Sequence, residues 1–315
     1  MLGRGRYTAF DKQIFCGDFM QAKFSPSDAA ISIFGFIKAN PQFTYRYIAI
    51  SAVVGLLNSF ALAAAGLFAF LERFTEISKG SSPPSSSEMM AAVNMIKLPH
   101  LAIFAIISTF VTILVLGMAL RKTVLNKEIG FYGLSWGNDE NQLGIAMLQL
   151  AGIWFAAYVL VFIFGSLVAM VSPFLAVLFF VAFVLFMVFL LGRCGMFGVY
   201  TIVNQKASLA QTARETKEQF WSFVGAYFLA WVICFIVVLV MQALTGLALR
   251  PLMGDVGASG YPTDFKGTFS IGAILYFALN GAFAGVFQLA LVCVGAFAYH
   301  KMNEALPATI NPATN

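Results

Sequence analysis

The sequence predicts an all-α membrane protein with six transmembrane helices. Of its 315 residues, 60% are hydrophobic and only 10% are charged, whereas a soluble globular chain carries about 25% charged residues. The mean hydropathy is +0.85, and the apolar residues gather in long uncharged runs. A soluble domain of this composition would expose large apolar patches and aggregate. The composition therefore excludes a soluble enzyme, a nucleic-acid-binding domain and a disordered scaffold.

The uncharged runs define the spans, because a helix needs about 20 apolar residues to cross a hydrocarbon core of about 30 Å. The run from Gly144 to Gly192 would be about 70 Å long as one helix, so it must turn once. Ser172-Pro173 is the expected turn, since proline interrupts helical hydrogen bonding and restricts the residue before it. We therefore predict a membrane domain over 48–301, with spans at 48–71, 98–120, 144–171, 174–192, 221–249 and 271–299.

Two amphipathic segments are expected to lie in the membrane interface on the cytoplasmic face. The first is 27–40, where Ser27-Asp28 offers a helix cap and Asn40-Pro41 ends the pattern. The second is 208–220, where Ser208 and Gln211 have the spacing of a capping box. Residues 1–47 form the cytoplasmic N-terminal segment in this prediction, and 302–315 form a disordered cytoplasmic tail.

The orientation follows from the basic residues. Fourteen of the 19 Lys and Arg residues fall on one side of the predicted spans, and basic loops stay in the cytoplasm. Aromatic residues that favour the interface lie on the same side: Tyr45, Tyr47, Tyr132, Trp136, Trp221 and Tyr299. We therefore predict a multi-pass protein of the bacterial inner membrane with both termini in the cytoplasm.

The net charge of +5 does not indicate a nucleic-acid partner. A nucleic-acid-binding surface clusters its Lys and Arg, but here the basic residues are spread thinly among the segments between the spans. The cysteines contain no C-x-x-C pair and are predicted to be free thiols: Cys16, Cys194, Cys234 and Cys293.

No catalytic, cofactor-binding or metal site is predicted. The cores of the spans lack Asp, Glu, Lys and Arg, whereas ion-coupled transporters commonly need a buried ionisable group. His100 and His300 fall at opposite ends of the membrane and cannot share a metal. Nucleophile and phosphate-binding motifs are missing as well. Asp139 and Glu140, after a capping Asn138, are expected to stabilise the positive end of the third span.

Uncharged polar residues are the candidate site. Five residues of the sixth span fall within an arc of about 140° on one helical face, with two glycines in G-x-x-x-G spacing: Asn280, Gly281, Ala284, Gly285 and Gln288. Asn58, Gln149 and Gln242 add single amides to spans one, three and five. Amides in lipid seek partners on other helices, so this face is expected to pack inside the bundle, to form a homodimer interface or to line a polar cavity.

Two short segments resemble known membrane proteins. The stretch GLSWGNDENQL, 133–143, resembles a segment that precedes a span in uncharacterised multi-pass membrane proteins of alphaproteobacteria, although Ser135-Trp136 stand where that pattern has a basic and an apolar residue. The segment 208–221, with Lys217 and Phe220-Trp221, is similar to interfacial helices of the membrane domain attached to some bacterial glycerophosphodiester phosphodiesterases. The resemblance implies a six-helix inner-membrane protein, without a soluble phosphodiesterase domain and with no catalytic residue carried over.

These observations favour a non-catalytic membrane component that binds a protein partner, pairs with a second copy or organises membrane lipid. An uncoupled transporter or channel for a small neutral or amphipathic solute is the alternative, and it would use the buried amides. An intramembrane or lipid-modifying enzyme is a third possibility, which is disfavoured because the sequence shows no nucleophile–base pair or metal-ligand set.

Overall fold

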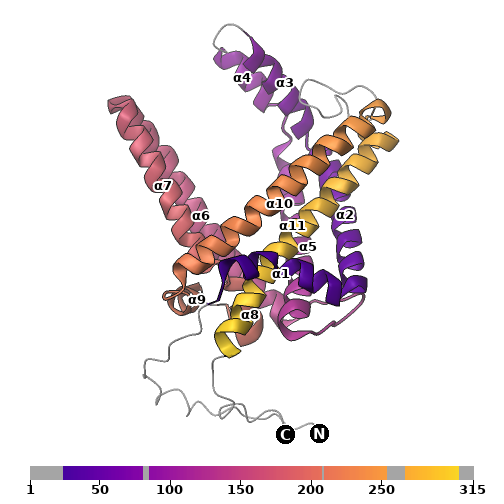
Figure 1. The fold of residues 1–315 in the computed structure, drawn as a ribbon. Helices are drawn as coiled ribbons and strands as arrows, with labels where there is room; N and C mark the ends of the chain where they lie inside the picture. Colours follow the sequence, from indigo (N-terminus) through magenta and orange to yellow (C-terminus); the bar gives the residue numbers. More distant parts are fainter. Residues whose placement is uncertain (1–23, 81–84, 208, 254–266, 305–315) are drawn as a thin grey trace.

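The computed structural model describes residues 24–80, 85–207, 209–253 and 267–304, and the regular structure of these residues is helical (Figure 1). Six helices are long and apolar enough to cross a membrane, so the predicted all-α class with six spans is confirmed. The helices in chain order are α1 (Pro26–Ala39), α2 (Pro41–Ala64), α3 (Leu67–Lys79), α4 (Ser86–Val93), α5 (Leu98–Leu125), α6 (Asn138–Val171), α7 (Pro173–Cys194), α8 (Phe197–Asn204), α9 (Leu209–Glu215), α10 (Phe220–Leu249) and α11 (Ile271–Glu304), with short 3-10 helices at Arg250–Leu252 and Gly267–Phe269.

The N-terminal helix α1 lies where the sequence predicts a short amphipathic helix. The Ser25 side chain caps it by accepting a hydrogen bond from the backbone N–H of Asp28, and Asn40 separates it from α2. Its apolar face, with Ala29, Ala30 and Ile33, is buried against α10 and α11, across which α1 runs (Figure 1).

The first span ends earlier than the uncharged run suggests. The expected span is 48–71, whereas α2 runs over Pro41–Ala64 and the chain turns at Gly66, which has a φ of +81°. A Cβ atom on Gly66 would lie 2.1 Å from the Met95 carbonyl oxygen, and the Lys97 N–H donates to the Ala65 carbonyl at 2.9 Å. The turn therefore returns the chain to the start of α5 and leaves α3 and α4 as a helical pair between two spans.

The turn within the long uncharged run lies at Ser172-Pro173, as predicted. Ser172 has extended backbone, and Pro173 opens α7. The hairpin of α6 and α7 projects away from the other spans and packs on them only at its lower end (Figure 1). It is longer than expected, because α6 begins at Asn138 and α7 continues to Cys194.

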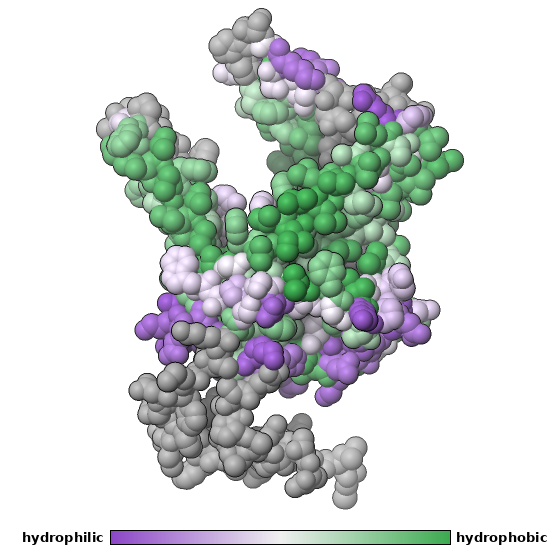
Figure 2. Space-filling view, viewed as in Figure 1, coloured by the Kyte–Doolittle hydropathy of each residue, from purple (hydrophilic) through white to green (hydrophobic). Residues whose placement is uncertain are grey.

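Helix α11 is the centre of the bundle. Its most apolar window is 56% buried, against 22% or less in the other five spans, and it packs against α2, α5 and α10. Figure 2 shows apolar side chains over α7, α10 and α11, with hydrophilic residues gathered below them and at α3 and α4 above. This banded surface is the pattern of an integral membrane protein.

Two smaller expectations fall partly outside the described residues. Cys194, Cys234 and Cys293 are free thiols as predicted, and Cys16 lies outside the description. The predicted disordered tail begins at 302, but residues 302–304 still belong to α11, and 305–315 are not described.

Candidate functional site

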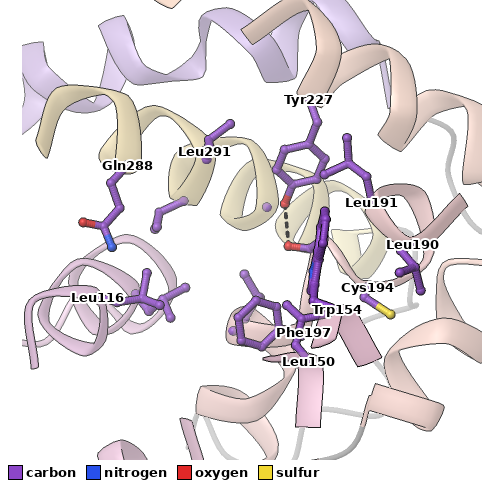
Figure 3. A pocket seen from close by; sticks show the side chains of 16 residues that line it. Leu116, Leu150, Trp154, Leu190, Leu191, Cys194, Phe197, Tyr227, Gln288 and Leu291 are labelled. Atoms are coloured by element: carbon purple, nitrogen blue, oxygen red, sulfur yellow. Dashed lines mark hydrogen bonds between the residues drawn. The ribbon is translucent and has the colours of Figure 1, made fainter. Parts of the chain in front are cut away.

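An apolar cavity of about 270 Å³ lies where the α6–α7 hairpin meets the other spans. Five of the long helices and α8 form its walls, mostly with leucine and aromatic side chains, among them Leu116, Leu150, Trp154, Leu191, Phe197 and Leu291 (Figure 3). Leu116 lies in the C-terminal half of α5, Leu191 near the C-terminal end of α7, and a further lining residue, Tyr227, near the start of α10.

Tyr227 of α10 and Gln288 of α11 bring a hydroxyl and an amide to the lining of this cavity, alongside the indole of Trp154 and the thiol of Cys194. The buried Tyr227 hydroxyl donates to the Gly195 carbonyl at 2.8 Å (Figure 3). That bond joins the end of α7 to α10, so the Tyr227 hydroxyl already has a partner within the cavity wall. Gln288 brings the one carboxamide to the described lining of this cavity.

A second, polar cavity of about 170 Å³ lies between α2, α5 and α11. Its lining includes four of the five predicted residues of the sixth span, Gly281, Ala284, Gly285 and Gln288, together with Asn58 of α2. Ser51 and Thr112 also line it. The structure therefore gathers most of the predicted polar face around one space inside the bundle.

The remaining predicted amides lie elsewhere. The Gln242 side chain donates from Nε2 to Oδ1 of Asn280 at 3.0 Å, which links α10 to α11. Gln149 is exposed on α6 and lines neither cavity.

The glycine pair of the sixth span faces α2. A Cβ atom on Gly55 would lie 2.2 Å from the Cα atom of Gly281, and one on Gly285 would lie 2.4 Å from the Ser51 hydroxyl. Helix backbones approach this closely only where side chains are minimal. The Gly281–Gly285 stripe is thus covered by α2, and both glycines also line the polar cavity.

The hydroxyl of Ser51 is the unsatisfied group of this site. Ser51 is 7% exposed, and its Oγ has no hydrogen-bond partner among the described residues. Next to it, the Tyr47 hydroxyl donates to Oε1 of Gln288 at 3.0 Å, which fixes the amide between the two cavities. Ser51 was missed from the sequence because hydroxyl residues in a helix usually bond their own backbone.

A buried ion pair joins α5 to α6. Arg121 of α5 pairs with Glu140 of α6, with side chains 2% and 1% exposed. Arg121 also donates to the Gly133 carbonyl at 2.9 Å, and Glu140 accepts from the Gly137 N–H at 2.9 Å. The sequence predicts Asn138 as the cap, with Asp139 and Glu140 at the positive end of the helix. Asp139 and Glu140 do lie in the first turn of α6, but the cap is Gly137, not Asn138. The intervening loop folds back so that Glu140 also meets Gly117 inside the protein.

The polar side chains that line the two cavities are neutral, and most of them are hydroxyls and amides. Within the described part of the chain, no group of three or more His, Cys, Asp or Glu side chains is placed to hold a metal ion. The polar groups of the cavities can donate and accept hydrogen bonds but carry no formal charge. They are therefore suited to binding an uncharged polar group.

A surface cluster at the lower face supplies a pH-dependent contribution to stability. Lys122 Nζ and Arg46 Nη2 lie 3.0 and 2.7 Å from the carboxylate oxygens of Glu128, and their hydrogen bonds lower its pKa. The stabilisation is therefore present above the ordinary glutamate pKa of about 4.3 and is lost as the pH falls through the lowered value.

We expect Glu128→Gln to lower the unfolding temperature at pH 7, by the equivalent of about 1 kcal/mol or less because the group is partly exposed. Below the lowered pKa of Glu128 the variant and the wild type should unfold together, since both side chains are then neutral. Thermal unfolding in detergent at the two pH values measures this. A difference that stays the same at both pH values would contradict the assignment.

No protein-family model, curated protein or solved structure matches this chain. The resemblances noted for 133–143 and 208–221 stay predictions.

Proposed function

We propose that this integral membrane protein is a membrane-organising component of the bacterial inner membrane, with cytoplasmic termini, which binds the chain of an amphipathic lipid. The observation that supports this proposal is the apolar cavity between the α6–α7 hairpin and the other spans. Ligand sites are concave and mostly apolar, with a few polar groups that fix orientation. Here Gln288 is that group.

The surroundings of the cavity favour a lipid as the occupant. The hairpin stands apart from α10 above the cavity, and both faces are apolar (Figure 2), so a chain has a lateral route from the bilayer. Lipid tails are about as apolar as leucine, so moving a chain from bilayer to cavity gains little by itself. Selectivity must then come from the polar groups at the end of the cavity.

The test is photolabelling with a long-chain fatty acid that carries a diazirine in mid-chain, followed by mapping of the labelled peptides. We expect labels on α6, α7 and α11. Leu191→Trp, which fills the cavity, should reduce this labelling about fivefold or more. Leu185→Trp is the matched control, because Leu185 is 64% exposed on the same helix and does not line the cavity. If the labelling is the same in Leu191→Trp as in the wild type, the proposal is rejected.

An uncoupled transporter for a small neutral solute is the second candidate, and the polar cavity between α2, α5 and α11 favours it. Proteoliposomes in a glycerol gradient should then equilibrate faster than protein-free liposomes. Equal rates would reject transport of this solute class. The partner-binding form of the hypothesis stays a prediction, to be tested by purification in mild detergent.

A further inference from the structure

We propose that the two cavities bind one amphiphile with an uncharged, hydroxylated head, whose head occupies the polar cavity and whose chain occupies the apolar cavity. This inference rests on the proposed function and adds the chemical class of the head group. It is argued from Gln288, from Ser51 and from the neutrality of the polar cavity.

Gln288 places the two cavities next to each other. Its side chain lines both of them, and Figure 3 shows its amide at one end of the apolar cavity, near Leu116. Because Tyr47 donates to Oε1 of Gln288 at 3.0 Å, the amide is held in place and its NH₂ group remains as a donor. A molecule at this position meets a polar wall on one side and a hydrocarbon wall on the other.

Ser51 shows that the polar cavity accommodates a hydrogen-bonding group. In α2, Thr44 and Ser59 satisfy their hydroxyls by donating to the carbonyls of Asn40 and Gly55, each at 2.9 Å. Ser51 lies between them on the same helix and makes no such bond, although its residue is only 7% exposed. Buried hydroxyls are nearly always paired, so this one is available for a ligand.

The other polar side chains of the cavity have the same character. Asn58 and Thr112 line it and add an amide and a hydroxyl. The described lining carries no charged side chain, so a phosphate or carboxylate head would be desolvated there without a counter-charge, which is costly. A water occupies about 30 Å³ of liquid, so a space of about 170 Å³ has room for about five groups of that size, enough for a three-carbon head with two hydroxyls.

The experiment compares two photoreactive probes with the same diazirine-bearing chain, a monoacylglycerol and the corresponding fatty acid at pH 8. We expect half-maximal labelling of the apolar cavity at a concentration about tenfold lower for the monoacylglycerol. Ser51→Ala should abolish that tenfold preference without lowering the unfolding temperature, because it removes a hydroxyl that has no partner. Ser59→Ala is the matched control on α2 and should keep the preference, since its hydroxyl bonds its own helix.

Thr112→Val, which is nearly isosteric, provides a second test on α5 and should also reduce the preference. Equal labelling by the two probes, or an equal loss for both in Ser51→Ala, would overturn the inference while the lipid-binding function stands. Labelling of the cavity by neither probe would overturn the proposed function as well.

Discussion

Glu140→Gln is expected to lower the free energy of unfolding by about 3–5 kcal/mol, because it leaves the Arg121 guanidinium buried without a counter-charge. Arg121 is 2% exposed, and its second interaction, with the Gly133 carbonyl, does not neutralise it. Glutamine keeps the size of the side chain, so the loss reports charge rather than packing. Thermal unfolding in detergent or in lipid nanodiscs measures the effect.

The matched control is Glu76→Gln. Glu76 pairs with Arg73 at 3.0 Å, but both side chains are exposed, and such pairs are worth about 1 kcal/mol or less. The double variant Arg121→Met/Glu140→Gln should recover more than half of the loss, because it removes the unpaired charge. If Glu140→Gln were as mild as Glu76→Gln, the ion pair would not stabilise the junction of α5 and α6.

This ion pair also explains one limit of sequence reasoning. Hydropathy places Arg121 at the end of a span and Glu140 at the start of the next, and charges at such positions usually face the interface. The loop between them folds back along α5, so that Gly133 contacts the Met118 side chain and Gly117 leaves room for Glu140. Only the three-dimensional path of the loop turns two apparent surface charges into a buried pair.

The spans themselves could be predicted because each must supply about 20 apolar residues on its own. Their ends depend on local geometry that hydropathy does not measure. Residues 65–71 are as apolar as the rest of the first run, yet the helix ends there. The chain turns at Gly66, where the close contact with the Met95 backbone leaves no room for a Cβ atom.

The candidate site could be predicted only in part for a similar reason. Helical periodicity places Asn280 and Gln288 on the same broad face, but their partners come from different helices: Gln242 of α10 for Asn280, and Tyr47 of α2 for Gln288. Ser51 belongs to the candidate site because its buried hydroxyl has no hydrogen-bond partner among the described residues. That property depends on the position of α11 and has no signature in the sequence.

The contact between α2 and α11 carries the second large prediction, since it both closes the bundle and shapes the polar cavity. A side chain at Gly281 would place its Cβ 2.6 Å from the Ser51 carbonyl oxygen and 2.7 Å from the Cα of Gly55. Neither backbone atom can rotate away, so α2 and α11 must separate. We expect Gly281→Val to cost about 3 kcal/mol or more, at the upper end of the range for overpacked cores.

Gly246→Ala in α10 is the control, because a Cβ there meets nothing within 4 Å and alanine favours the helix by about 1 kcal/mol over glycine. The folded fraction after size-exclusion chromatography and the unfolding temperature should fall for Gly281→Val and hold or rise for Gly246→Ala. Because the same displacement changes the space around Ser51, any Gly281→Val that still folds should also lose the preference for the monoacylglycerol probe. A Gly281→Val variant as stable and as selective as the wild type would mean that α2 and α11 do not meet at their glycines.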